Sequence, residues 1–348
     1  MSALLELKNV TKIFGSRAKG TVALDDFSLS ISDNAPSFTA IAGESGSGKT
    51  TLARLLLGFT RPTTGEVWYR GQNLWKMPGR DWRGFRQEVQ AIFQDPFEVF
   101  NPFYHVDHLL TVPIERFHLA KSKSQASTLI DDALDAVGLR PEETLGRYPH
   151  QLSGGQRQRL TIARALLVQP RLIIADEPVS MVDASLRATI LESIDKLFRD
   201  FGISFLYITH DLTTAYQISD DIIILYRGSV AEVGSIDRVV KNPLHPYSKL
   251  LVASIPEPNV DQRWGEDQPL PGAGTAEAAV GGCKFAGRCP FAMPICREHA
   301  PPLFRTDGNR AAACFLYKDA PVIAGGEIND VLFQRRSLCP VEFSKAGT

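Results

Sequence analysis

The chain carries, at residues 43–50, the stretch Gly43-Glu44-Ser45-Gly46-Ser47-Gly48-Lys49-Thr50. This stretch matches the phosphate-binding pattern G-x-x-x-x-G-K-[ST] at every fixed position. Glycines in such a loop let consecutive backbone N–H groups turn toward anionic oxygens, and a helix that follows adds partial positive charge. We expect Lys49 to reach the β- and γ-phosphates of a nucleotide and the Thr50 hydroxyl to coordinate Mg²⁺.

The residues on either side of this loop supply the context that the pattern requires. Residues 37–42 predict a short buried strand, and residues 51–57 predict the start of a helix that Gly58 ends. The alternative is a glycine-rich turn that binds nothing. It is disfavoured because strand, loop and helix follow one another in the required order.

Size and charge narrow the class of protein. The 348 residues suit about two domains. The net charge is -1, with 38 basic and 39 acidic residues, so no overall field attracts nucleic acid or an anionic membrane. The start of the chain resembles no secretion signal, and no apolar run approaches the roughly 18 residues of a spanning helix. We therefore expect a cytoplasmic protein that meets a membrane only through a partner.

Several segments before residue 100 predict strands. Residues 5–10 and 22–29 alternate between apolar and polar residues and predict a half-buried antiparallel pair. Phe14, on the loop expected between them, is either an ordinary core aromatic or a face for an adenine ring. Residues 66–69 and 89–96 predict two further strands. Gln94, at the end of the second, is either a turn residue or a neutral oxygen ligand for a metal.

Helices are expected from residue 96 to about residue 150, as an inserted helical subdomain. The apolar residues between positions 129 and 137 fall on one helical face, and Gly138 follows them. At the end of this region stands Leu152-Ser153-Gly154-Gly155-Gln156, where Ser153 is expected to cap the next helix. A glycine-rich helix start is a second place where unsatisfied N–H groups favour an anion.

Two later strands are expected to end in ionisable residues. The apolar run before Asp176 and Glu177 predicts a buried strand that ends in two adjacent carboxylates. Such a pair is costly to bury unless charge or chemistry compensates, and Mg²⁺ at Asp176 with an attacking water at Glu177 would do so. Residues 203–209 predict the next strand, which delivers His210 to the same sheet edge. The alternatives are a solvated turn for the carboxylates and a structural role for the histidine.

Taken in order, these motifs resemble the full set of an ATP-binding cassette (ABC) subunit. The resemblance covers roughly residues 1–255, and the Leu-Ser-Gly-Gly-Gln stretch at 152–156 is its most specific part. A narrower likeness comes from residues 93–96, 100–102 and 242–247 and from the C-terminal cysteines. These are similar to the ATPase subunits of oligopeptide and dipeptide importers, a family that includes nickel and oligosaccharide importers.

The resemblance implies an α/β fold and a domain plan. The fold would be an ABC-type phosphate-loop core with a mixed sheet flanked by helices, an antiparallel β subdomain, an inserted helical subdomain and a small cysteine-containing C-terminal region. The ATP-binding domain would span 1–255, with the helical subdomain at about 96–153. A linker at 256–282, a cysteine-rich region at 283–320 and a tail at 321–348 would follow.

The resemblance also implies roles for individual residues. Glu177 would be the general base, His210 would sense the γ-phosphate, and Lys49 would complete the catalytic set. Magnesium would be held by Thr50, Gln94 and Asp176. The nucleotide would be bound by Phe14, Gly43, Ser45, Gly46, Gly48, Lys49, Thr50, Thr51, Gln94 and Asp176, and by Ser153, Gly155, Gln156 and Asp183. Of these, Ser153 and Gly155 would act across a dimer, in the site of the other subunit.

The implied partners are those of an importer. They are a second ABC ATPase subunit, more often a paralogue than an identical copy, two transmembrane permease subunits and, indirectly, an extracytoplasmic substrate-binding protein. The chain would then sit on the cytoplasmic face of the inner membrane. Peptide is the expected solute, with oligosaccharide as a contender, and no nucleic acid is expected.

The C-terminal cysteines lie at Cys283, Cys289, Cys296 and Cys314, separated by five, six and seventeen residues. This spacing lacks the C-x-x-C pairs of a zinc ribbon, yet four clustered cysteines in a cytoplasmic protein favour thiolate ligation over disulfides. The resemblance implies a [4Fe–4S] cluster, and Zn²⁺ or unligated buried thiols are the alternatives. Cys339 lies outside the spacing and is expected to be a bystander.

Two rival functions use the same motifs. The first is a soluble ABC ATPase that acts on nucleic acid or ribosomes, with the cysteines as a binding module, and the near-neutral charge opposes it. The second is a regulatory module without hydrolysis, which the intact Lys49, Glu177 and His210 oppose. Co-purification with membrane subunits or with nucleic acid would separate the importer from the first rival.

Overall fold

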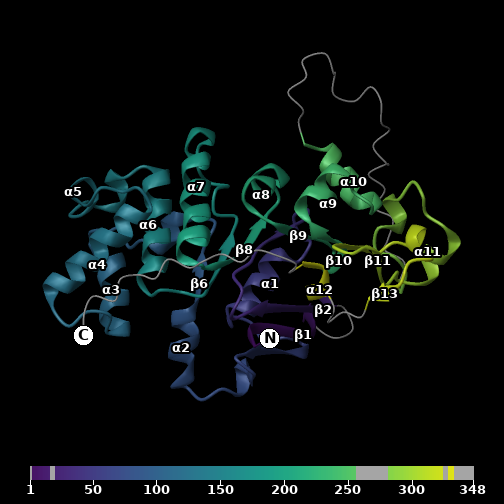
Figure 1. Ribbon diagram of the computed structural model, residues 1–348, viewed down its shortest axis with the longest axis horizontal. Coiled ribbons are helices and arrows are strands. Elements are labelled where there is room, and N and C mark those ends of the chain that lie inside the picture. Colours follow the sequence, from purple (N-terminus) through teal and green to yellow (C-terminus); the bar gives the residue numbers. More distant parts are fainter. Residues whose placement is uncertain (1, 16–19, 256–280, 324–327, 333–348) are drawn as a thin grey trace, which may run out of the picture.

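The computed structural model describes residues 2–15, 20–255, 281–323 and 328–332 (Figure 1). Two sheets organise the chain. The larger has the strand order β13-β11-β12-β10-β9-β3-β8-β7-β6, and the smaller has the order β2-β1-β4-β5. Figure 1 shows the helices α3 to α6 at one end of the long axis and the C-terminal elements β13 and α11 at the other. The predicted α/β class with a mixed sheet, flanking helices and an antiparallel sheet is confirmed.

The strands of the larger sheet from β9 to β6 run parallel to one another. These strands are β6 (Val89–Ile92), β7 (Leu172–Asp176), β8 (Ser204–Thr209), β3 (Phe38–Ala42) and β9 (Asp221–Tyr226). The register pairs Ile92 with Ala175, Asp176 with Ile208, and Ala42 with Thr209. Because parallel strands end at a common edge, the segments that follow Ile92, Asp176, Thr209 and Ala42 meet there.

The two faces of this sheet bury different side chains, because successive residues of a strand point to opposite sides. On β8, Phe205 and Tyr207 join one apolar cluster with α6 (Gly154–Leu167) and α7 (Ala184–Phe201). The intervening Leu206 and Ile208 join a second cluster with α1 (Lys49–Leu56) and the smaller sheet. The strands are thus buried on both sides, which explains their nearly continuous apolar sequences.

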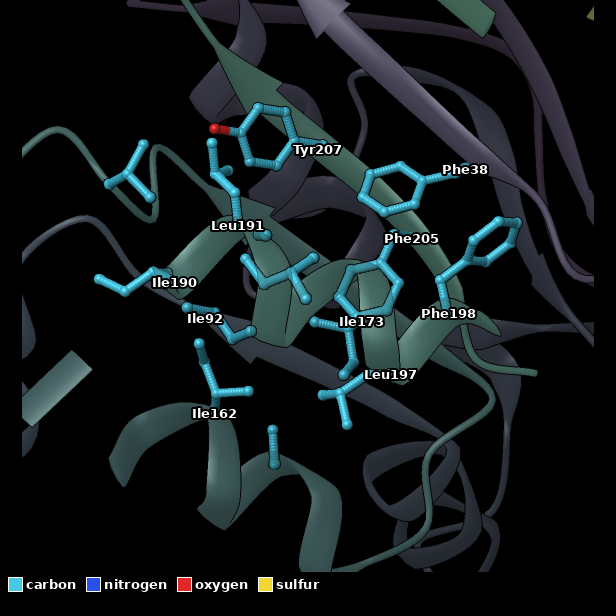
Figure 2. Packing of buried hydrophobic residues seen from close by; sticks show 14 of the residues in the cluster. Phe38, Ile92, Ile162, Ile173, Ile190, Leu191, Leu197, Phe198, Phe205 and Tyr207 are labelled. Carbon is cyan, nitrogen blue, oxygen red and sulfur yellow. The ribbon is translucent and has the colours of Figure 1, made fainter. Parts of the chain in front are cut away.

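Aromatic rings fill the first of these clusters, as Figure 2 shows. The Phe38 ring stacks on Phe205 with centroids 5.1 Å apart and meets Phe198 edge-on at 5.3 Å. Offset-stacked and edge-to-face pairs are the favoured aromatic geometries. This packing holds α7 against the strand β3 that leads into the phosphate-binding loop.

The smaller sheet is antiparallel throughout. It consists of β1 (Ala3–Phe14), β2 (Thr21–Ser32), β4 (Thr64–Tyr69) and β5 (Gln72–Asn73). The sequence placed Phe14 on a loop, but Phe14 is the last residue of β1 and pairs with Thr21. The apolar–polar alternation stops at Val10, while backbone pairing continues to Phe14, and only the latter defines the strand.

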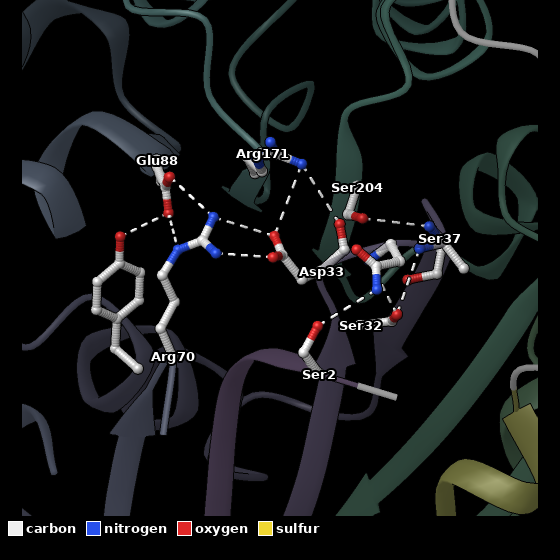
Figure 3. Close-up of polar contacts among 11 residues, drawn as sticks. Ser2, Ser32, Asp33, Ser37, Arg70, Glu88, Arg171 and Ser204 are labelled. Carbon is white, nitrogen blue, oxygen red and sulfur yellow. Dashed lines mark hydrogen bonds and ion pairs between the residues drawn. The ribbon is translucent and has the colours of Figure 1, made fainter. Parts of the chain in front are cut away.

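A network of charged groups ties this smaller sheet to the larger one (Figure 3). The Arg70 guanidinium donates to Asp33, with Nη1 2.7 Å from Oδ2, and to Glu88, with Nε 2.7 Å from Oε2. Tyr69 donates its hydroxyl to the same Glu88 carboxylate, and Arg171 lies 3.7 Å from Asp33. Arg171 precedes β7 and Glu88 precedes β6, so the network lies at the amino ends of these strands, away from their carboxyl ends.

The helical segment follows β6. It contains η2 (Pro96–Val99), α3 (Asp107–Phe117), α4 (Lys123–Ala136), α5 (Pro141–Thr144), η3 (Pro149–Gln151) and α6. Ile130, Ala133 and Leu134 are buried on α4, and Gly138 follows with φ +69°, as the sequence predicted. Ser153 caps α6 and exchanges hydrogen bonds with Gln156, which confirms the predicted cap.

The C-terminal region adds strands to the larger sheet, which the sequence did not predict. Strand β10 (Ser229–Ser235) pairs with β12 (Arg310–Ala312), and β11 (Leu303–Asp307) and β13 (Val322–Ile323) follow. The helices between and around them are α9 (Ile236–Lys241), α10 (Pro246–Ala253), α11 (Pro294–Glu298) and α12 (Ile328–Leu332). The edge of β10 is therefore covered by the same chain, which satisfies backbone groups that would otherwise invite another strand.

The remaining elements are short connectors. They are η1 (Leu74–Lys76), α2 (Asp81–Glu88), α8 (Leu212–Ile218), η4 (Ala286–Arg288) and η5 (Phe315–Tyr317). No helix within the described ranges combines the length and the apolar character needed to cross a bilayer. Cys339, most of the expected linker at 256–282 and most of the tail lie outside the described residues.

Candidate functional site

The phosphate-binding loop joins β3 to α1, and its backbone geometry requires glycine at two positions. Gly43 has φ +155°, and a Cβ there would lie 2.2 Å from the Leu225 carbonyl oxygen. Gly48 has φ +106°, and its Cβ would lie 2.3 Å from the Ala23 carbonyl oxygen. Only glycine fits such close backbone contacts. The loop is therefore held tightly between neighbouring strands, while Gly46 faces open space.

Lys49 lies inside the loop, and its ammonium group donates hydrogen bonds to backbone carbonyl groups of the same loop. Its Nζ donates to the Gly43 oxygen at 2.6 Å and to the Glu44 oxygen at 3.0 Å. The residue is only 6% exposed, and burial lowers the pKa of the Lys49 ammonium, while the Glu177 and Asp176 charges oppose this shift. An anion in the loop would stabilise the charged form of this buried amine.

Two carboxylates stand at the carboxyl end of β7. Burial, together with the neighbouring Glu177 charge, raises the pKa of Asp176, and a hydrogen bond with Thr50 opposes the shift. Glu177 adopts φ +49°, an uncommon backbone conformation for a residue with a side chain, and its N–H donates to the Ile208 oxygen at 2.8 Å. This backbone turn directs the two neighbouring carboxylates to different surroundings.

His210 follows β8 and contacts the second carboxylate. Its Nδ1 lies 3.0 Å from the Glu177 Oε1, and the side chain is 57% exposed. The register of β7 and β8 brings the two residues together, because Asp176 pairs with Ile208. Lys49, Thr50, Asp176, Glu177 and His210, from three separate parts of the sequence, thus converge at one sheet edge.

Within the described residues, no hydrogen bond, ion pair or ring contact joins Gln94 or Phe14 to this group. Gln94 is exposed two residues after β6, and the carbonyl of the preceding Phe93 accepts a hydrogen bond from Gln158 on α6 at 3.3 Å. Phe14 is 46% exposed, with the Lys12 Nζ 5.0 Å from its ring centroid. The loop residues Ser45 and Thr50 are exposed, and Thr51 is half-buried at the start of α1.

The segment Ser153-Gly154-Gly155, here called the Ser-Gly-Gly tip, has no hydrogen bond or ion pair with the residues that converge at the sheet edge within the described ranges. Ser153 is exposed, and across the described ranges no hydrogen bond or ion pair links residues 153–156 to the phosphate loop or the carboxylates. Gly155 is buried, and a Cβ there would lie 2.9 Å from the Leu186 Cδ1 of α7. Asp183 is exposed and precedes α7 as its N-cap residue. Because Ser153 is exposed at the start of a helix, where the first N–H groups lack intrahelical partners, this segment can serve a site outside its own subunit.

The C-terminal cysteines line one small pocket together with His245 and Phe285. The predicted [4Fe–4S] cluster is wrong, because among the described residues no group of three or more His, Cys, Asp or Glu side chains is arranged to hold a metal ion. Burial raises the pKa of the Cys283 and Cys289 thiols and raises that of Cys314 to about 11. Burial therefore favours the neutral thiol at Cys283, Cys289 and Cys314, and Zn²⁺ finds no support either.

His245, in the wall of this pocket, is expected to make the stability of the protein depend on pH. Burial lowers the pKa of His245 to about 4 from its ordinary 6.5. Below pH 6.5 the His245 side chain binds a proton in the unfolded chain but stays neutral in the folded protein. The free energy of unfolding therefore falls as the pH decreases from 6.5 toward 4. We expect this residue to lower the free energy of unfolding by about 1 kcal/mol between pH 7.5 and 5.5.

The measurement compares denaturant unfolding of the wild type with that of His245→Asn at both pH values. The His245 Nδ1 accepts from the Tyr247 N–H at 3.0 Å, and an asparagine oxygen can take over this cap. The variant is expected to be less stable throughout but to lose less stability on acidification. His118→Asn, at an exposed residue with φ +53°, is the control. Equal pH slopes in the wild type and His245→Asn would contradict the prediction.

Three residues near the site were missed by the sequence analysis. They are Gln158, Tyr247 and Arg288, which contact the backbone of Phe93, the backbone of Glu44 and the side chain of Glu44. Tyr247 belongs to a stretch that was singled out only for its likeness to a family. No local pattern connects a residue with a partner that is 65, 203 or 244 positions away.

The fold and the site together define the class of protein. A phosphate loop after β3, carboxylates after β7, a histidine after β8 and a capped Leu-Ser-Gly-Gly-Gln helix start form an ATP-binding cassette. Residues 24–180 match the family model of the ABC transporter, and residues 231–296 match that of the oligopeptide/dipeptide transporter C-terminal region.

Known proteins support a narrower assignment. The chain is 38% identical over 321 residues to the putative oligopeptide transport ATP-binding protein YkfD of Bacillus subtilis, covering 91% of this chain and 96% of that protein. It is 39% identical to OppF, an oligopeptide transport ATP-binding protein of Salmonella typhimurium, covering 76% and 79%. The chain belongs to this family of oligopeptide transport ATP-binding proteins, and it is an ABC-type ATPase.

A solved structure agrees with this fold. The ATP-binding cassette MJ0796, in a dimeric post-hydrolysis state bound to ADP and Pi, superposes with a TM-score of 0.59 at 29% identity. The match covers 67% of this chain and 98% of that one. The alternative of a soluble ATPase that acts on nucleic acid has no support from these relatives.

Proposed function

We propose that ATP is bound and hydrolysed at the sheet edge where Lys49, Asp176, Glu177 and His210 meet. The observation that carries this proposal is the convergence of a buried lysine, a carboxylate pair and a histidine beside the phosphate loop. In this proposal the loop N–H groups and Lys49 hold the β- and γ-phosphates. Lys49 exchanges its bonds to the Gly43 and Glu44 carbonyls for bonds to phosphate oxygens.

The same residues suit a bound Mg²⁺. Asp176 is a half-buried carboxylate whose charge is disfavoured by its surroundings, and it already hydrogen-bonds Thr50. Oxygen donors of this kind are what Mg²⁺ prefers, so Thr50 and Asp176 fit the ion, with Gln94 as a further ligand. When bound, the ion would neutralise charge on the phosphates.

In this proposal Glu177 is the general base. Its Oε1 contacts the His210 Nδ1, so the carboxylate is oriented by the residue that follows the neighbouring strand β8. A carboxylate that is held in this way can accept a proton from a water beside the terminal phosphate. His210, which is more than half exposed, is then placed to contact that phosphate and to report whether it is present.

The proposal includes a second ATPase subunit. In this proposal, Ser153, Gly155, Gln156 and Asp183 complete the site of the partner, since within the described residues no hydrogen bond or ion pair links them to the phosphate loop of their own subunit. The dimeric cassette MJ0796 bound to ADP and Pi supports such an arrangement. Phe14, at the exposed end of β1, would stack on the adenine ring. We favour a paralogous partner subunit.

Family members work with transmembrane permease subunits. We propose that two such subunits bind here, that an extracytoplasmic binding protein delivers oligopeptides to them, and that this chain sits at the cytoplasmic face of the inner membrane. Exposed phenylalanines around the helical segment support a docking surface: Phe59, Phe93, Phe97 and Phe103, the last 87% exposed. The Phe59 and Phe93 rings stack with centroids 6.4 Å apart, and exposed aromatic rings of this kind favour a protein partner.

The experiment reconstitutes the ATPase with its permease subunits in lipid vesicles. Oligopeptides, presented with their binding protein, are expected to stimulate hydrolysis, and an oligosaccharide or nickel is not. The variant Phe59→Ser/Phe103→Ser is expected to bind the permease at least about tenfold more weakly, because it removes two apolar anchors. ATP binding by the free subunit should not change.

The matched control is Phe291→Ser, which alters a ring that is 52% exposed in the C-terminal region. It should bind the permease as the wild type does. If Phe59→Ser/Phe103→Ser binds the permease as tightly as the wild type does, the proposed docking surface is wrong. If only an oligosaccharide stimulates hydrolysis, the proposal that oligopeptides are the transported solute is wrong.

A further inference from the structure

The C-terminal region holds the second residue of the phosphate loop. Arg288, in η4, donates two hydrogen bonds to the Glu44 carboxylate, with Nη1 3.0 Å from Oε2 and Nη2 3.1 Å from Oε1. Such a two-point contact fixes the direction of the carboxylate as well as its distance. Arg288 and Glu44 form an ion pair, and the hydrogen bonds to Glu44 raise the pKa of the Arg288 guanidinium.

Glu44 is fixed at two further atoms. Its backbone N–H donates to the Tyr247 hydroxyl at 2.8 Å, and Tyr247 is fully buried on α10. Its carbonyl oxygen accepts from the Lys49 Nζ. The amide, the carboxylate and the carbonyl of one loop residue thus bind three different parts of the protein. Of these contacts, only the one to Lys49 comes from within the loop itself.

Phe285 anchors the segment that supplies Arg288. The Phe285 ring is 2% exposed and packs against Tyr226, Tyr247 and His245, with centroids 5.3, 5.6 and 5.8 Å away. Tyr226 ends β9, the neighbour of the strand that leads into the loop. Buried aromatic contacts of this kind hold a short turn in one position.

Lys284, which precedes Phe285, contacts the turn at residues 227–229, and this turn contacts the phosphate loop. Its Nζ donates to the Arg227 oxygen at 3.0 Å and to the Ser229 Oγ at 2.7 Å. The turn between these residues contains Gly228, whose N–H donates to the Ser47 oxygen of the phosphate loop at 2.9 Å. Residues 284–288 therefore contact the loop directly at one end and through one turn at the other.

We infer that residues 284–288, here called the C-terminal clasp, hold the phosphate loop in its nucleotide-binding shape, with Arg288 as a positioning residue that acts through Glu44. The inference rests on the ATP site proposed above. A loop that is already ordered loses less conformational entropy when it binds phosphate. Arg288 also balances a negative charge, which would otherwise repel the triphosphate.

The clasp is expected to affect ATP affinity more than the chemical step. Glu177 and His210 follow the strands β7 and β8 and have no hydrogen bond or ion pair with the clasp within the described residues. The side chains of Arg288 and Glu44 are 30% and 41% exposed, so water weakens their pairing. We expect Arg288→Ala to raise the ATP Kd and KM about three- to tenfold and to leave kcat within about twofold.

The test uses the full chain and measures equilibrium ATP binding together with steady-state hydrolysis. Arg297→Ala, at an exposed arginine of α11, is the matched control and should leave the Kd unchanged. A double-mutant cycle with Glu44→Gln separates positioning from general damage. In the Glu44→Gln background, Arg288→Ala should have little further effect on the Kd, whereas a merely structural role would add its full effect.

Thermal unfolding without nucleotide shows whether each variant folds. If Arg288→Ala does not fold, Arg288→Gln takes its place, since it keeps much of the side-chain length and removes the charge. A folded variant with the wild-type Kd and KM overturns the inference, as does an undiminished effect in the Glu44→Gln background. If Lys49→Ala also leaves ATP binding intact, the proposed site itself fails; if only Arg288 has no effect, the clasp alone fails.

Discussion

Glu177→Gln is expected to lower ATP hydrolysis about 10²–10⁴-fold while ATP binding stays intact, because the loss of a general base acts on the chemical step. The amide keeps the size of the side chain and an oxygen that can contact His210 Nδ1, which lies 3.0 Å from the carboxylate in the wild type. What the amide lacks is a basic oxygen that can take a proton from water.

The measurement pairs single-turnover hydrolysis with equilibrium ATP binding. The matched control is Glu192→Gln, the same change at an exposed residue of α7, which should hydrolyse ATP at the wild-type rate. Near-normal turnover by Glu177→Gln would remove Glu177 from this role. A parallel loss of binding would instead indicate that Glu177 supports the shape of the site.

Lys49→Ala is expected to weaken ATP binding about 10- to 100-fold, the value of one or two hydrogen bonds from a charged donor to phosphate. The nucleotide-free protein should remain folded after this substitution. Burial lowers the pKa of Lys49, which means that the folded protein disfavours this cation when no anion is present. Its removal costs the bonds to the Gly43 and Glu44 carbonyls but also ends that unfavourable burial.

Titration calorimetry with ATP and Mg²⁺ checks this expectation, and thermal unfolding without nucleotide checks the fold. Lys123→Ala removes an exposed lysine at the start of α4 and should leave the Kd unchanged. An ATP Kd for Lys49→Ala within twofold of the wild-type value would show that the phosphates bind elsewhere.

The strand ends of the site were open to prediction because each depends on a short local pattern. An apolar run that ends in Asp176-Glu177, or in Thr209-His210, predicts a buried strand and identifies its last residue. The parallel order of the strands then brings those ends to one edge, and the register of β7 with β8 does so here. The cap at Ser153 is local in the same sense, since its partner is Gln156.

Phe14 and the cysteines mark where local reasoning failed. Phe14 was assigned to a loop because side-chain alternation ends before it, although the backbone pairing with Thr21 continues the strand. The cysteines were assigned a cluster from their number, spacing and family likeness. Ligation needs at least three side chains in a metal-binding arrangement, and among the described residues no His, Cys, Asp or Glu group has that arrangement, which the spacing of the cysteines does not reveal.

By itself, the sequence determined the phosphate loop, the strand and helix that frame it, the carboxylates and the family, because these depend on residues that are close neighbours in the chain. Only the tertiary structure decided that β12 and β11 extend the main sheet, that Arg288 binds the Glu44 carboxylate and that burial raises the pKa of the Cys314 thiol. Each of these depends on segments far apart in sequence and on the exclusion of water between them. Contact and desolvation of that kind arise only when the chain packs.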